Sequence, residues 1–125
     1  DRGNDRIQIY GLDGAYRRVI DEGTETPSGF AAFGDYLVVA ELKARLFVLD
    51  RDDRILGYLG DGRHHCDQDG WPNRKDADGA TVKPLDDIPA GEFNSPHGIA
   101  ADPAGNIYVT EWLLGDRFIK LERLT

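Results

Sequence analysis

A short apolar strand that opens with arginine occurs three times along the chain, and this repetition constrains the fold more than any other feature. The copies are residues 6–10, 45–49 and 117–121, which read Arg-Ile-Gln-Ile-Tyr, Arg-Leu-Phe-Val-Leu and Arg-Phe-Ile-Lys-Leu. The first two copies begin 39 residues apart, and the third begins 72 residues later. We interpret the longer interval as one repeat plus an insertion, because only one further set of strands lies within it. A period of about 40 residues indicates a fold made of stacked copies of one unit.

The segments around each copy share one pattern of strands and turns. Apolar runs separated by a Gly/Asp turn precede the second copy at 30–41, and the same arrangement precedes the third at 97–111. Short β-branched and aromatic runs between Gly, Asp and Pro predict antiparallel hairpins. No segment has the 3.6-residue apolar period of a helix. Four short strands in about 40 residues predict an all-β fold, a β-propeller with four-stranded blades.

The blades are distributed unevenly along the 125 residues. Residues 1–20 supply the end of one blade, 29–60 a complete blade, 61–92 a long loop, and 93–125 the first three strands of a last blade. This is about two and a half blades, whereas closed propellers typically have about 4–8. We therefore expect the chain to be the C-terminal part of a longer propeller. The alternative is a ring assembled from several copies. In both cases missing blades or self-association would cover the unpaired strand edges.

The charge balance narrows the class of partner. The chain has 23 Asp and Glu against 15 Lys and Arg, a formal net charge of −8. A nucleic-acid surface needs clustered Lys and Arg, and anionic lipid attracts basic segments, so both partners are disfavoured. No apolar run approaches the roughly 20 residues of a membrane helix. We expect a small-molecule or peptide ligand, with no nucleic acid and no membrane.

Two segments resemble the NHL repeat. Residues 94–102 read Asn-Ser-Pro-His-Gly-Ile-Ala-Ala-Asp and are followed at 105–110 by Gly-Asn-Ile-Tyr-Val-Thr. Residues 1–10 resemble the second half of the same repeat, and the middle copy keeps only its pattern. The resemblance covers about three quarters of the chain and implies a propeller of the NHL type.

A narrower resemblance is to the C-terminal half of the peptidyl-α-hydroxyglycine α-amidating lyase family and its bacterial relatives. It rests on Asp-Arg ahead of Arg-Ile-Gln at 1–8, Gly-Trp-Pro-Asn at 70–73, and Phe-x-x-Pro-His at 93–97. It implies six blades and a catalytic zinc held by one histidine from each of three Pro-His motifs. His97 matches the last of these histidines, the other two would lie before residue 1, and Arg2 matches an active-site arginine. Gly98 stands where that family has an aspartate on a structural calcium, which puts calcium in doubt.

His97 is a candidate metal ligand on chemical grounds as well. A neutral imidazole binds zinc well, and an open catalytic zinc takes three protein ligands plus water. Residues that open the first strand of each blade converge on the central channel of a propeller. Bound metal there would acidify water or polarise the hydroxyl of a carbinolamide substrate. One histidine does not make such a site, and the alternative is that His97 bonds a neighbouring blade.

Further candidates lie in the long loop and at a strand end. His64 and His65 open a run of six residues that holds several metal-ligand types. It is either a polar surface loop or a loop over the channel mouth that adds His64 or His65 to a site. Glu111 and Trp112 end a second strand, on the face where propellers bind ligands, and we group Trp71 with them. The alternative for Trp112 is that it covers the edge of the core. The repeated arginines are predicted to pair with adjacent acids.

Two classes of function follow. The first is a zinc-dependent lyase that cleaves a carbinolamide C–N bond, with His97 as a ligand and Arg2 near the substrate. The second is a module without chemistry, in which the propeller face and residues 61–92 bind a protein, peptide or sugar. Fold alone does not decide between them, because propellers carry many unrelated functions.

Overall fold

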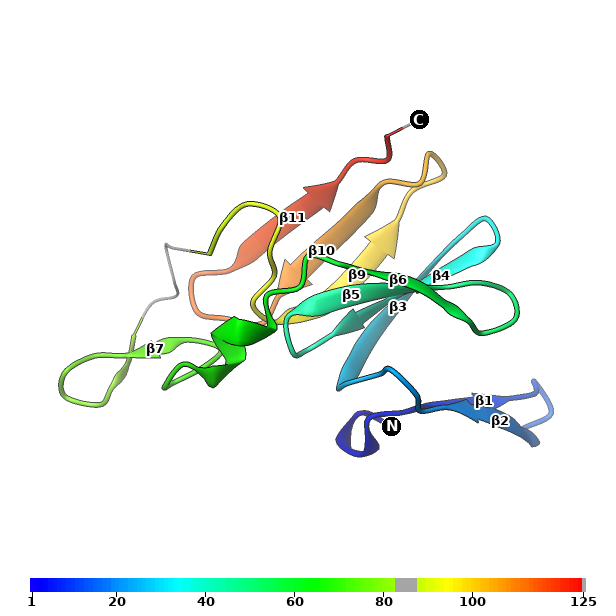
Figure 1. The fold of residues 1–125 in the computed structure, drawn as a ribbon, viewed down its shortest axis with the longest axis horizontal. Coiled ribbons are helices and arrows are strands. Elements are labelled where there is room, and N and C mark those ends of the chain that lie inside the picture. Colours follow the sequence, from blue (N-terminus) through cyan, green and yellow to red (C-terminus); the bar gives the residue numbers. More distant parts are fainter. Residues whose placement is uncertain (83–87, 125) are drawn as a thin grey trace.

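A four-stranded antiparallel sheet forms the centre of the computed structural model, which describes residues 1–82 and 88–124 (Figure 1). Its strands are β3 (Pro27–Phe33), β4 (Tyr36–Glu41), β5 (Arg45–Leu49) and β6 (Ile55–Leu59), paired in chain order. This is the meander expected of one complete blade. Across the described ranges there is no α-helix, and thus no helix that could cross a membrane.

Two smaller antiparallel sheets flank the central one. One consists of β1 (Ile7–Tyr10) and β2 (Tyr16–Ile20). The other consists of β9 (Pro96–Ala101), β10 (Ile107–Glu111) and β11 (Arg117–Leu121), with β10 in the middle. Sheets of two, four and three strands confirm the all-β prediction and fit a partial NHL-type propeller.

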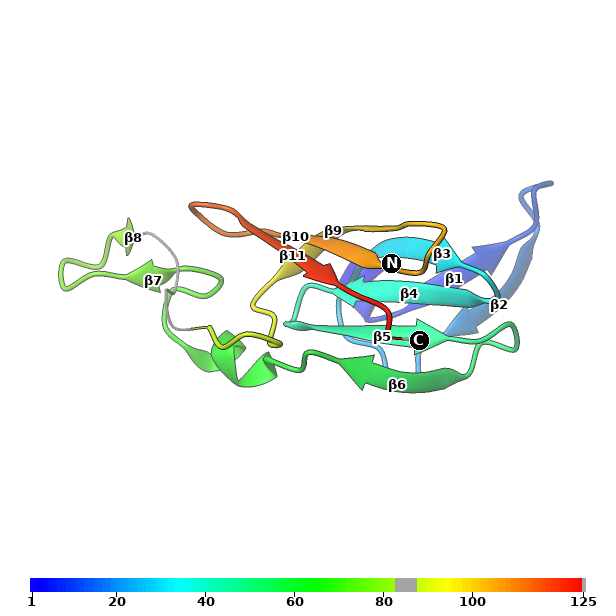
Figure 2. The same cartoon turned by 90° about the horizontal axis from the view of Figure 1, so that it is seen from above.

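The three sheets stack face to face, and the central sheet is covered on both sides (Figure 2). Successive residues of a strand point to opposite faces. Val38 and Ala40 of β4 therefore pack toward β9–β11, whereas Val39 between them packs toward β1–β2. The first core contains Val38, Ala40, Leu46, Phe93, Ile107 and Val109, and the second contains Ile7, Val39, Phe47 and Leu49.

The first strands of the last two blades lie side by side. Ser28 Oγ on β3 donates to the carbonyl of Pro96 on β9 at 2.9 Å and to that of Ala40 at 3.0 Å. A β-carbon at Gly29 would lie 2.8 Å from the carbonyl oxygen of His97, so glycine permits this approach. The neighbouring first strands are what the inner wall of a propeller requires.

The repeated arginines each pair with a nearby acid, as predicted. Arg6 Nε contacts Asp1 at 2.7 Å, Arg117 Nη1 contacts Glu111 at 3.0 Å, and Arg45 pairs with Glu41. The arginine that recurs at the start of these three strands therefore has a structural role, which is to pair with a nearby acidic side chain.

The segment 61–92, expected as a loop, contains ordered structure. It begins with a 3₁₀ turn, η2 (Arg63–Asp67), and continues into the small hairpin of β7 (Arg74–Lys75) and β8 (Thr81–Val82). The hairpin turn forms because the Asp76 carboxylate accepts two backbone N–H groups, from Asp78 and Ala80, both at 3.0 Å. Residues 83–87 of this segment, and residue 125 of the last blade, lie outside the described residues.

Candidate functional site

The residues predicted to be functional all come from one end of the stacked sheets. Because the strands are antiparallel, β4, β6 and β10 end there and β3, β5 and β9 begin there. The turn η2 follows β6 at the same end, where Gly62 N donates to the carbonyl of Ala44 at 2.8 Å. We call this end the rim. It carries Arg2, His64, His65, Trp71, His97, Glu111 and Trp112.

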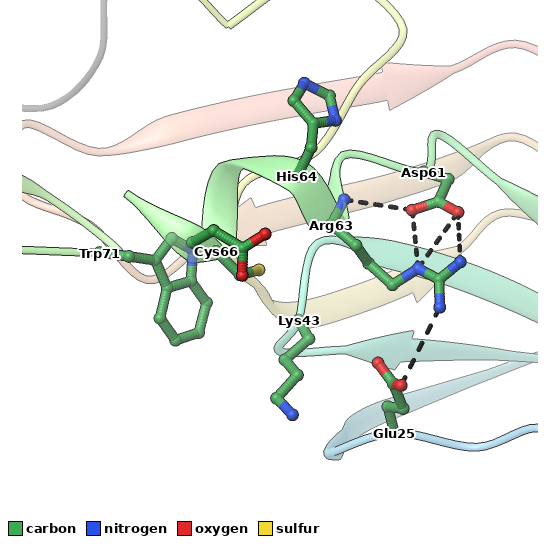
Figure 3. A pocket seen from close by; sticks show the side chains of 8 residues that line it. Glu25, Lys43, Asp61, Arg63, His64, Cys66 and Trp71 are labelled. Carbon is green, nitrogen blue, oxygen red and sulfur yellow. Dashed lines mark hydrogen bonds and ion pairs between the residues drawn. The ribbon is translucent and has the colours of Figure 1, made fainter. Parts of the chain in front are cut away.

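A pocket of about 760 Å³ opens on the rim beside η2 (Figure 3). Glu25 reaches it from just before β3, and Lys43 from the turn between β4 and β5. The remaining walls come from residues 61–71, and they include Arg63, Cys66, Asp67 and Trp71. The pocket is thus built where the inserted segment folds back over the complete blade. Of the predicted binding-face residues, it contains Trp71.

Arg63 is held within the pocket wall by acids. Its Nε and Nη2 both lie 2.9 Å from Asp61 oxygens, and its Nη1 lies 3.9 Å from Glu25. These hydrogen bonds from Arg63 hold the pKa of the Asp61 carboxyl below its usual value. The Lys43 ammonium has no carboxylate partner within the described part of the chain. Lys43 is therefore the pocket cation that is available to a ligand.

A hydrogen bond from the indole nitrogen holds Trp71 in place, and the indole ring lines the pocket. The indole N–H donates to the carbonyl of Asn94 at 3.0 Å, and Asn94 Nδ2 donates back to the carbonyl of Pro72 at 2.7 Å. This reciprocal pair ties the Gly-Trp-Pro-Asn element to the residues ahead of β9. The half-buried ring in Figure 3 lies across the pocket from Glu25.

Cys66 is not an activated nucleophile. Burial raises the pKa of its thiol to about 11, and the opposing effect of Lys43 is smaller. The thiolate is the reactive form of cysteine, so the protonated Cys66 side chain is an apolar part of the wall at neutral pH.

His64 and His65 converge on one carboxylate. His65 Nε2 lies 2.8 Å from Glu92 Oε2, and His64 Nε2 lies 3.4 Å from the same oxygen. His65 is buried, whereas 62% of the His64 side chain is exposed. In Figure 3 the ring of His64 points away from Trp71 and Lys43. His64 is also one of the residues that line the pocket, so this cluster lies at the pocket's edge.

His97 stands apart from that cluster. It is exposed on β9, and its ring centroid lies 6.4 Å from that of Trp112, which is 59% exposed. Over residues 1–82 and 88–124, the metal-ligand residues that gather in a group of three are His64, His65 and Glu92, without His97. The described residues therefore supply His97 alone toward the three-histidine zinc that the resemblance implies, whose other two ligands would come from other blades.

Gly98, which stands where the resembling family has an aspartate, has a close neighbour on the adjacent strand. It pairs with Thr110 across the ladder, and a β-carbon at 98 would lie 2.5 Å from Thr110 Oγ1. A side chain there would require Thr110 to turn. The position brings no carboxylate to a calcium ion.

Glu111 is not on an open binding face, which corrects the sequence-based prediction. It is 6% exposed. Its Oε1 accepts the backbone N–H groups of Asn94 and Ser95, at 2.5 and 3.0 Å, and its Oε2 accepts Arg117 at 3.0 Å. Both oxygens therefore bond the chain itself. Glu41 has the same role in the complete blade, where it accepts the Glu25 N–H and pairs with Arg45.

Arg2 lies in an exposed 3₁₀ turn, η1 (Arg2–Asn4), ahead of β1. Asp5 connects this turn to the rim. Its carbonyl oxygen accepts a hydrogen bond from the Thr24 hydroxyl, and its carboxylate accepts one from the Thr26 backbone N–H at 2.7 Å. No ion pair within the described ranges involves the Arg2 guanidinium. Its proposed catalytic role rests on the resemblance alone.

Sequence reasoning missed Glu92, Glu25 and Lys43. Glu92 is 27 residues from His65, and Glu25 lies 18 residues before Lys43. No local spacing links such residues. The repeated Val-x-Glu at the ends of β4 and β10 was a usable signal, and it marks the two buried structural carboxylates.

Comparison with known families identifies one repeat. A family model for the NHL repeat matches residues 93–112, which span β9 and β10 and the residues just ahead of them. No curated protein matches the chain. The last blade therefore contains an NHL repeat, which supports a β-propeller module, and the three sheets are consistent with part of such a propeller.

Proposed function

We propose that this chain is a ligand-binding part of an NHL-type propeller, and that the rim pocket takes a small molecule or a peptide side chain. The pocket itself supports this proposal. Its volume of about 760 Å³ lies within the roughly 300–1,000 Å³ that is usual for small-molecule sites. Ligand sites combine apolar walls with a few convergent polar groups, and Trp71 and Lys43 supply one of each.

The charges around the pocket favour a ligand with one acidic group. A carboxylate or phosphate of the ligand would pair with the Lys43 ammonium. It would not have to displace an acidic side chain of the protein, because Lys43 has no such partner in the described residues. An aromatic or apolar part of the same ligand would pack on the ring of Trp71, since tryptophan gives a large apolar surface with a fixed orientation. Glu25 and Asp67 on the wall would disfavour a second acidic group.

N-acetylphenylalanine, which carries one carboxylate and one ring, is a suitable probe for an NMR titration of the ¹⁵N-labelled chain. We expect the indole N–H signal of Trp71 to shift and that of the exposed Trp112 to stay in place. Lys43→Ala should weaken binding by about tenfold, because it removes one charge-assisted hydrogen bond. Lys120→Ala is the matched control, since Lys120 pairs with Glu122 at 2.6 Å outside the pocket. Equal shifts at both tryptophans, or unchanged affinity in Lys43→Ala, would contradict the proposal.

Amidating-lyase chemistry is the second candidate, for a complete ring that contains this segment. The observation that favours it is the exposed imidazole of His97 at the start of β9, the inner strand that lies beside β3. In the described part of the chain His97 has no partner ligand, so two more histidines would have to come from other blades. Two further Pro-His motifs at blade openings of the longer polypeptide would support this candidate. Their absence would oppose it.

A further inference from the structure

We propose that His64, His65 and Glu92 form a binding site for a divalent transition metal of the zinc class. This site adjoins the rim pocket, because His64 also lines that pocket while its ring points away from Trp71 and Lys43 (Figure 3). It also excludes His97, which does not join the group.

The ligand atoms are spaced for one ion. A tetrahedral zinc with bonds of about 2.0–2.1 Å places its ligand atoms about 3.3 Å apart. The two histidine Nε2 atoms lie 2.8 and 3.4 Å from Glu92 Oε2, and the three ligand atoms all lie within 4.8 Å of one another. A separation of 4.8 Å is about 1.5 Å longer than in such a site, so two side chains that share this difference would each shift by under about 1 Å to centre an ion.

The donor set selects the class of metal. Two imidazoles and one carboxylate suit zinc and its first-row neighbours, whereas calcium and magnesium take oxygen ligands. Three protein ligands leave one position for water, and the exposed ring of His64 leaves the ion a path from solvent. His65 Nδ1 has no hydrogen-bond partner in the described residues, so no acceptor would orient the ring from behind once Nε2 binds the metal. We therefore expect weaker binding than at a four-ligand structural zinc.

Metal binding would hold the two ends of the inserted segment 61–92 together. Two ligands lie in η2 and the third lies directly ahead of β9, so one ion would clamp together the two ends of the segment 61–92. Backbone bonds already bring these ends close: Phe93 N donates to the carbonyl of Gly60 at 3.0 Å. A metal that binds the folded state alone raises the melting temperature by mass action.

The test is a titration of the chelator-treated full chain with Zn²⁺ alone. Calorimetry measures the binding, and thermal melting with and without Zn²⁺ measures the stabilisation. We expect one Zn²⁺ per chain and a higher melting temperature. His64→Ala should weaken binding by at least about 100-fold, since even residues behind a ligand contribute 10–100-fold. Glu92→Gln keeps the size and a hydrogen-bonding group, and it should lose binding in the same way. His64 is exposed, so its replacement leaves the core intact.

Two controls identify the ligands. His97→Ala removes another exposed histidine of the rim, and Cys66→Ser removes the thiol next to His65. Both should bind Zn²⁺ as the unaltered chain does. The proposal is overturned if the unaltered chain binds no zinc, if His64→Ala binds it equally well, or if either control loses it. Lys43→Ala should leave zinc binding unchanged, so this result is independent of the pocket proposal.

Discussion

Buried carboxylates in this protein bond its own backbone. Glu41 and Glu111 end equivalent strands, accept N–H groups from the segment that leads into the first strand of their own sheet, and pair with the arginine that opens the third strand. A buried charge without such partners would cost several kcal/mol. Conspicuous charge at a strand end therefore indicates blade construction in this chain, whereas the ligand groups that we propose, Lys43 and Glu92, lie at less regular positions.

Cys66 should react slowly with iodoacetamide in the folded protein. With a thiol pKa of about 11, the thiolate fraction at pH 8 is about 100-fold below that of a thiol with pKa near 9. The rate should rise as pH approaches 11 and should reach the ordinary value in denaturant. Because the pKa is higher in the folded than in the unfolded chain, the protonated thiol contributes fully to the free energy of unfolding below pH 9. That contribution is lost as the pH rises toward 11. Alkylation of the folded chain as fast as of the denatured chain would contradict this.

The contact between β3 and β9 sets how closely the blades approach at the inner wall. It depends on a backbone without a side chain at Gly29 and on the bridging hydroxyl of Ser28. Each blade is local in sequence, whereas this contact joins residues 68 positions apart. Glu25 of the pocket lies just before β3 and Glu92 of the proposed metal site lies shortly before β9, so this contact joins the two strands that follow them.

Gly29→Ala should lower the free energy of unfolding by about 1–3 kcal/mol, because overpacking of a close contact strains the backbone. The added β-carbon would lie 2.8 Å from the His97 carbonyl oxygen and 3.1 Å from Ile99 Cγ2. Gly57→Ala is the matched control in β6, where a β-carbon meets nothing within 4 Å. Urea denaturation measures both variants. Equal stability of the two would show that β3 and β9 do not approach as closely as described.

The three sheets form an arc and do not close a ring. Stacking covers both faces of the central sheet, but the outer face of β9–β11 exposes Tyr108 and Phe118, which are 42% and 76% accessible. A shallow, mainly apolar groove of about 400 Å³ lies there. In a closed propeller the next blade would cover such a face.

The isolated chain should therefore self-associate, which light scattering at increasing concentration would detect. Phe118→Lys should reduce the association, because it places a charge on the uncovered face. Leu12→Lys is the matched control, since Leu12 is even more exposed than Phe118 and lies in the turn between β1 and β2. A monodisperse monomer with a cooperative melt would show instead that the open face needs no cover.

The sequence by itself determined the blade pattern, because alternation of side chains and turn residues act between near neighbours. Arg45 and its acid four residues away follow from the repeat, and residues 93–112 carry a recognisable NHL signature. The tertiary structure alone decided that Glu92 meets His64 and His65, that Lys43 and Trp71 share a pocket, and that Glu111 is buried. Those contacts arise where blades stack and where the insertion folds back. They join residues that are far apart in the sequence and follow no regular interval, so no local pattern predicts them.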